Sequence, residues 1–120
     1  MNSNIKAQWL RALRSGNYQQ GHGILRGRSY PDPGTEEFCC MGVLADVIDP
    51  RRWSPPTEGS LVYGYEPLLG ISSAKQVSFL QSDMLAIAGL TQDDQSVLVG
   101  MNDNTCKSLS EIADYIEENL

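Results

Sequence analysis

The sequence predicts an α+β fold, in which several short helices surround a small antiparallel sheet. Three observations lead to this class. The chain has 120 residues, the size of one domain, so we expect a single domain over residues 1–120. Apolar residues recur at helical spacing near the N-terminus and through the second half. Between these regions lie short apolar runs separated by glycine and proline, which favour strands and turns.

A first helix is predicted over residues 4–14, because its apolar residues recur every four positions. These residues form one stripe: Ile5, Trp9 and Leu13. Ser3 or Asn4 is the expected N-cap, and Gly16 is the expected stop. Arg11 and Arg14 suit the last turn, where positive charge complements the helix dipole.

The middle of the chain is predicted to form short strands and one buried helix. A glycine-rich turn precedes a strand at Ile24 and Leu25, and Ser29–Gly34 has the composition of a loop. The most apolar stretch predicts a strand at Phe38–Cys40 and then a helix over Met41–Ile48. Pro50 ends that helix and begins a polar loop over residues 50–60.

After a short strand at Leu61–Tyr65, the second half is predicted to be helical. Cap and stop residues delimit its helices, of which the last is the most strongly marked. Gly89 ends a helix whose apolar face consists of Phe79, Leu80, Met84, Ile87 and Ala88. Thr91 caps a second helix, over about Asp93–Met101. Ser108 and Glu111 form a capping box for the last helix, whose apolar face consists of Leu109, Ile112, Ala113 and Ile116.

The charge distribution excludes some functions. The net charge is −6, so we expect no binding of a nucleic acid polymer, which usually needs a basic surface. Residues 1–52 hold seven basic and five acidic residues, whereas residues 53–120 hold two basic and ten acidic residues.

The sequence has neither an apolar run long enough for a membrane span nor a signal-peptide pattern. We therefore expect no membrane association and a cytoplasmic location.

The three cysteines are expected to be reduced thiols and not a disulfide framework. Cys39 and Cys40 lie where a strand turns into a helix, a position that can activate a thiol, and His22 is the one histidine able to act as a base. Buried inert thiols explain such an apolar run better.

No cysteine or histidine pair has zinc-ligand spacing, and the calcium-loop pattern after Met101 is incomplete. We expect no metal, no cofactor and no catalytic residue.

The segment after the first helix is rich in hydrogen-bond donors. Glycines at positions 21, 23 and 27 allow close approach of the backbone to a ligand, although neither a Walker A motif nor a dinucleotide fingerprint is present. Arginine forks, amides and one aromatic ring are the groups that recognise a phosphate with a base or ribose. A solvated hairpin is the alternative. The predicted ligand-binding residues are Arg14, Tyr18, Gln19, Gln20, His22, Arg26 and Arg28.

Three segments together resemble a family of small, largely uncharacterised proteins encoded by bacteriophages and prophages. They are WLRALRSGNYQQGHGILR (Trp9–Arg26), FCCMGVLADV (Phe38–Val47), and LVGMNDN with SLSEIADYIEENL (Leu98–Asn104 and Ser108–Leu120). The resemblance covers about half of the chain, and it brings no known site residues. It implies an accessory protein made in an infected bacterium, where such proteins often counter host defences.

These observations leave three functional hypotheses. The first is a non-catalytic binder that sequesters a small anionic, nucleotide-derived signal of the cyclic nucleotide or cyclic ADP-ribose type, and that is by analogy a homo-oligomer. The second is an inhibitor that binds a host defence or replication protein through the acidic C-terminal half, with Asp114, Glu117 and Glu118. The third is a cysteine hydrolase that uses Cys40 or Cys39 with His22.

Overall fold

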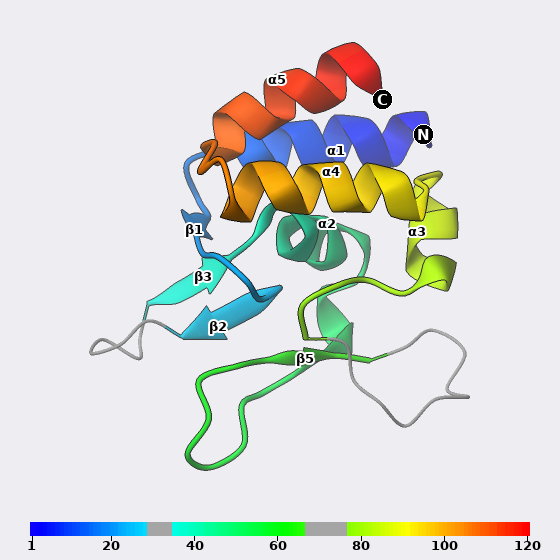
Figure 1. The fold of residues 1–120 in the computed structure, drawn as a ribbon. Coiled ribbons are helices and arrows are strands. Elements are labelled where there is room, and N and C mark those ends of the chain that lie inside the picture. Colours follow the sequence, from blue (N-terminus) through cyan, green and yellow to red (C-terminus); the bar gives the residue numbers. More distant parts are fainter. Residues whose placement is uncertain (29–34, 67–76) are drawn as a thin grey trace.

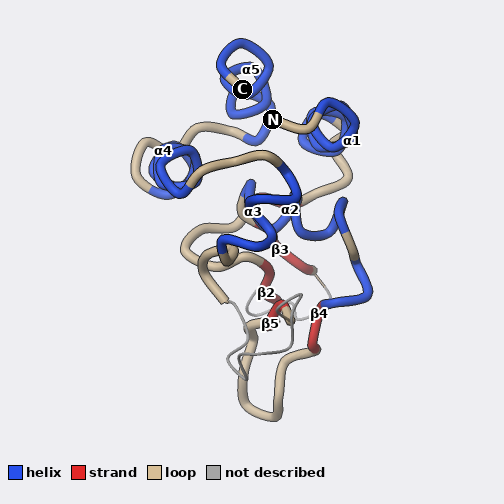
Figure 2. Tube along the Cα trace, turned by 90° about the vertical axis from the view of Figure 1, so that its right-hand side faces the viewer, coloured by secondary structure: helices blue, strands red, loops and turns tan. Residues whose placement is uncertain are grey.

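Helix α2 (Cys40–Ile48) lies at the centre of the computed structural model, which describes residues 1–28, 35–66 and 77–120. Every residue from Cys40 to Ala45 is buried. Figures 1 and 2 show a layer of helices on one side of α2 and short strands on the other. The helices of that layer are α1 (Ser3–Arg14), α4 (Gln92–Asp103) and α5 (Leu109–Asn119), and α3 (Ser82–Ala88) lies at the end of α4.

The strands are short and form two small sheets. One sheet has the order β1–β3–β2, with β1 (Gln19–Gln20) parallel and β2 (Arg26–Arg28) antiparallel to β3 (Glu36–Phe38). The other pairs β4 (Trp53–Ser54) with β5 (Gly64–Tyr65) in antiparallel register, and a single bridge joins Gly27 to Val62. A 3₁₀ turn over Pro50–Arg52 leads from α2 into β4.

Close backbone approach fixes the position of α2 over the strands. The N–H of Cys39 donates to the Leu25 carbonyl at 3.2 Å. A Cβ atom at Gly42 would lie 1.8 Å from that same carbonyl oxygen. Because the colliding atom belongs to the backbone, only glycine fits where α2 crosses this segment. On the opposite side, the indole N–H of buried Trp9 donates to the Cys40 carbonyl at 3.0 Å and ties α1 to α2.

The buried amide of Asn102, on α4, joins three parts of the fold. Its oxygen accepts from the Gln20 amide at 2.9 Å and from the Cys40 N–H at 3.3 Å. Its nitrogen donates to the Gly21 carbonyl at 2.9 Å and to the Asp103 carboxylate at 2.8 Å. All of its hydrogen-bonding capacity is therefore used inside the protein, and it links α4 to β1 and to the start of α2.

The α+β class is confirmed, and a helix forms in each predicted region. The helix before Gly89 is shorter than predicted, because α3 begins at Ser82, and Phe79 and Ile87 of its predicted apolar face are exposed. Helix α2 begins one residue before its predicted start, and the capping boxes of α4 and α5 form at Thr91 and Ser108. Gly89 ends α3 in the left-handed conformation, with φ of 74°. The predicted N-cap of α1 is wrong, because the Asn2 side chain accepts from the Ile5 N–H at 3.0 Å.

The strand predictions are less accurate than the helix predictions. The strand expected at Ile24 and Leu25 lies two residues further on, as β2, and β3 begins and ends two residues before the predicted strand. The three-stranded sheet is mixed and not purely antiparallel, because β1 runs parallel to β3. The predicted loop at Ser29–Gly34 lies outside the described residues. Within the described ranges, no helix has both the length and the apolar character that crossing a membrane requires.

Replacing Asn102 by alanine is expected to lower the free energy of unfolding by about 3 kcal/mol, because the Cys40 N–H and the Gly21 carbonyl lose buried partners. Urea denaturation followed by circular dichroism measures this change. Asn104→Ala is the matched control on an exposed side chain at the end of the same helix, and we expect it to stay within about 0.5 kcal/mol of the wild type. Equal unfolding midpoints for Asn102→Ala and the wild type would contradict the role of this amide.

Candidate ligand-binding site

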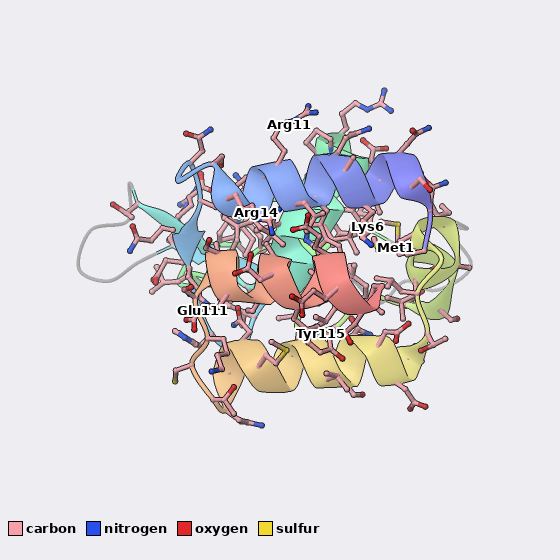
Figure 3. The ribbon with its side chains drawn as sticks, turned by 90° about the horizontal axis from the view of Figure 1, so that it is seen from above. Met1, Lys6, Arg11, Arg14, Glu111 and Tyr115 are labelled. Carbon is pink, nitrogen blue, oxygen red and sulfur yellow. The ribbon has the colours of Figure 1, made fainter. Side chains whose placement is uncertain are left out.

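The structure distributes the predicted ligand-binding residues over several places. Arg14 faces α5, where its guanidinium contacts Asp114 at 2.8 Å and Glu117 at 2.5 Å. Figure 3 shows Arg14 between α1 and α5. Gln20 is also engaged within the protein, because its amide donates to Asn102 and, at 2.8 Å, to the Lys107 carbonyl. Both side chains connect distant segments of the chain.

Arg26 occupies a box of aromatic rings. Its guanidinium carbon lies 4.0 Å from the ring centre of Tyr63, 5.1 Å from that of Phe38 and 5.3 Å from that of Trp53. The same guanidinium forms an ion pair with Glu36. A planar cation suits both kinds of partner, since it stacks on rings and pairs with a carboxylate in its own plane. The charge of Arg26 is thus balanced within the protein.

Tyr18 is held by a carboxylate that it shares with a tryptophan. The Tyr18 hydroxyl donates to Asp46 at 2.5 Å, and the indole N–H of Trp53 donates to the other oxygen of Asp46 at 2.9 Å. The Tyr18 ring packs edge-on against Phe38, with ring centres 4.9 Å apart. Burial and the hydrogen bond to Asp46 raise the pKa of Tyr18, so the hydroxyl stays protonated and the ring is fixed.

The other predicted ligand-binding residues lie nearer the solvent. Gln19 and His22 are exposed, and among the described residues neither side chain has a hydrogen-bond partner. Arg28 is half-buried, with its guanidinium 5.7 Å from the ring centre of Tyr63. The seven residues therefore do not form one cradle in this structure.

A hollow of about 380 Å³ lies where the C-terminal ends of α1 and α2 approach Tyr18. The described residues give it one cation, two amides, a serine hydroxyl and one aromatic ring over a small apolar surface. The lining residues are Gln8, Arg11, Ser15, Asn17 and Tyr18, with Ala12 and Val47 as the apolar part.

Tyr18 is the one predicted ligand-binding residue in this lining. Sequence reasoning missed the others, although a signal for them is present. Gln8, Arg11, Ala12 and Ser15 follow the spacing i, i+3, i+4, i+7, which places them on one face of α1. Figure 3 shows Arg11 on the side of α1 that points away from α5, in contrast to Arg14. Within the described residues, Arg11 has neither an ion pair nor a side-chain hydrogen bond, so its guanidinium is open to a ligand.

The thiols beside α2 are poorly placed for nucleophilic chemistry. Cys39 and Cys40 are buried, whereas His22 is exposed. Burial raises the pKa of Cys39 to about 11 and raises that of Cys40 well above its usual value. The Cys40 thiol donates to the Leu98 carbonyl at 3.6 Å. Both groups are protonated at neutral pH and shielded from substrate, which argues against the cysteine hydrolase hypothesis.

The acidic residues after Met101 also serve the fold. Asp103 accepts from the Gly23 N–H at 3.1 Å and from the Asn102 amide, and Glu111 caps α5 through Ser108. Nowhere in residues 1–28, 35–66 and 77–120 do three or more histidine, cysteine or acidic side chains gather in a group able to hold a metal ion.

Alkylation of the native protein by iodoacetamide at neutral pH is expected to modify Cys106 rapidly and Cys39 and Cys40 slowly. Cys106 is exposed, whereas the other two thiols are buried and held protonated. Peptide mass spectrometry after timed quenching measures each site, and a urea-unfolded sample, in which all three should react, is the control. Rapid labelling of Cys39 or Cys40 in the folded protein would restore the hydrolase hypothesis.

Comparisons with known proteins give a family and no function. The family model described as "Domain of unknown function (DUF8296)" matches residues 1–63. No curated protein and no solved structure matches the chain. The matched region runs from α1 through α2 and includes every residue that lines the hollow. The protein therefore belongs to the DUF8296 family, whose domain has no assigned function.

Proposed function

We propose that this protein is a phage or prophage accessory protein that acts in the host cytoplasm, where it binds and sequesters a small nucleotide-derived signal without catalysis. The ligand is of the cyclic nucleotide or cyclic ADP-ribose type. One observation carries this proposal: the hollow beside Tyr18 combines an open guanidinium, two amides and an aromatic ring. Its volume is about 380 Å³, and it is open to the solvent.

Each group in the hollow has a separate part in recognition. The Arg11 guanidinium pairs with a phosphate, since its planar fork matches two phosphate oxygens. The exposed amides of Gln8 and Asn17 offer donors and acceptors to a base edge or a ribose hydroxyl. Tyr18 gives an aromatic surface that is already fixed by Asp46, so little side-chain entropy is lost when a base stacks on it.

The lining favours binding over chemistry. Arg11, Gln8, Asn17, Ser15 and Tyr18 form no pair of nucleophile and base, because the Tyr18 hydroxyl already donates to Asp46 and the Ser15 hydroxyl to the Ala12 carbonyl at 2.7 Å. A ligand held there is removed from solution unchanged. A protein that acts in this way reduces a signal in proportion to its own concentration.

The cellular role rests on the resemblance to phage-encoded proteins. A phage accessory protein benefits from removing a nucleotide signal that activates host defence. By analogy with other sequestering proteins, we expect a homo-oligomer. Inhibition of a host protein through the acidic C-terminal half has less support, because two of the carboxylates assigned to it, Asp114 and Glu117, are already paired with Arg14.

Isothermal titration calorimetry with a panel of cyclic nucleotides and cyclic ADP-ribose species tests the proposal. We expect at least one ligand to bind the wild type, and Arg11→Gln to weaken that binding by about tenfold or more, because a charge-assisted contact to phosphate contributes about 1.5–3 kcal/mol. Arg51→Gln is the matched control: it removes the same charge from an exposed arginine that pairs with its neighbour Asp49, outside the hollow.

Two results would overturn the proposal. One is the absence of heat from every member of the panel at high protein concentration. The other is equal weakening by Arg11→Gln and Arg51→Gln, which would mean that the hollow is not the binding site. If the affinity instead falls on substitution of Gln19 or His22 to alanine, the ligand lies on the strand side of Tyr18, near β1.

A further inference from the structure

The electrostatic surroundings of the hollow differ from those of most phosphate sites. The hollow lies at the C-terminal ends of α1 and α2, where helices carry partial negative charge. The Asp46 carboxylate accepts a hydrogen bond from the hydroxyl of Tyr18, the aromatic residue of the lining, at 2.5 Å. The net charge of the chain, −6, adds a long-range field of the same sign.

Among the described residues, Arg11 is the one cation in the lining that opposes this negative field. Arg14, three residues further along α1, does not add to it, because its guanidinium is already paired with Asp114 and Glu117 on the α5 side. Arg26, whose guanidinium lies over the Phe38 ring that packs against Tyr18, is paired with Glu36 inside the aromatic box. The hollow therefore has enough positive charge to balance one negative charge on a ligand.

We infer that the hollow selects nucleotides that carry a single negative charge on a cyclic phosphodiester and discriminates against nucleotides with a terminal phosphate. The inference rests on the proposed function and narrows its ligand to cyclic mononucleotides, because the diphosphate of cyclic ADP-ribose carries two negative charges. A cyclic phosphodiester has one charge, and Arg11 can pair with it completely. A terminal phosphomonoester carries close to two charges at neutral pH, since its second pKa is about 6. Its second charge has no partner among the cations of the described lining and is opposed by the C-terminal ends of α1 and α2.

The experiment compares matched ligands that differ in this charge and share base and sugar. For each common ribonucleoside, the cyclic monophosphate and the linear 5′-monophosphate are titrated into the protein at low and moderate salt. We expect the cyclic form to bind about tenfold more tightly, because the linear form brings one charge that no cation of the described lining balances. Because exposed charges are screened, the preference should shrink as salt is added.

Asp46→Asn identifies the origin of the preference. The substitution removes the carboxylate charge and keeps the size of the side chain, so the ratio of the two affinities should fall towards one. The measured quantity is the ratio of the affinities for the cyclic and the linear ligand. A change in the position of Tyr18 would weaken the binding of both ligands, so its effect on this ratio would largely cancel. A thermal melt confirms that the variant is folded before titration.

The possible outcomes separate this inference from the proposed function. Binding of the linear monophosphates as tightly as the cyclic forms overturns the charge preference and leaves the sequestration proposal standing. An unchanged ratio in Asp46→Asn overturns the assignment of the preference to the surroundings of Tyr18. If neither the cyclic nor the linear form of any nucleotide binds, and no ligand of the calorimetry panel gives heat, both the proposed function and this inference are wrong.

Discussion

The fold depends on one buried amide, that of Asn102, more than on any strand pairing. Strands of two or three residues make few ladder hydrogen bonds, so most of the backbone groups beside them need other partners. Asn102 provides two of these partners, for the Gly21 carbonyl and the Cys40 N–H, and it holds the Gln20 side chain. An apolar residue of the same size would leave these groups unsatisfied beside the most buried helix of the protein.

This constraint explains why a segment with so many donors does not form a cradle. Gln20 and Arg26 have the chemistry of ligand-binding residues, and both are used inside the fold. Gln20 joins β1 to α4 and to the Lys107 carbonyl, and Arg26 pairs with Glu36 on the neighbouring strand β3. A sheet this small covers little surface, so the polar side chains that flank it become part of the packing. The sequence alone does not separate the two uses, because an arginine that pairs with Glu36 across a sheet and one that awaits a phosphate look the same.

The helices could be predicted because their signals are local. Capping boxes at Thr91 and Ser108 and a glycine stop at position 89 act within four residues of the helix end that they mark. The sheet could not be predicted in the same way, since strands of two or three residues are too short for an alternating pattern. The parallel pairing of β1 with β3 joins Gln19 to Glu37, and nothing near either residue specifies that contact. For the site, Tyr18 could be predicted as an aromatic surface. Arg11 could not be chosen over Arg14, because the sequence does not show that Arg14 faces α5 and pairs with its carboxylates.

Helix α1 shows how packing creates a free site. One side of the helix carries Trp9 and Leu13 and is buried against the core. A second side faces α5, where Lys6 and Arg14 contact the backbone and side chain of Glu117. A helix with two covered sides in a protein this small keeps a third side uncovered, and on α1 that side bears the polar lining of the hollow. Because Arg14 is already paired with α5, and Arg26 with Glu36, a small acidic protein keeps one arginine available at this surface. The positive charge available in the hollow therefore depends on which arginines the fold has already paired.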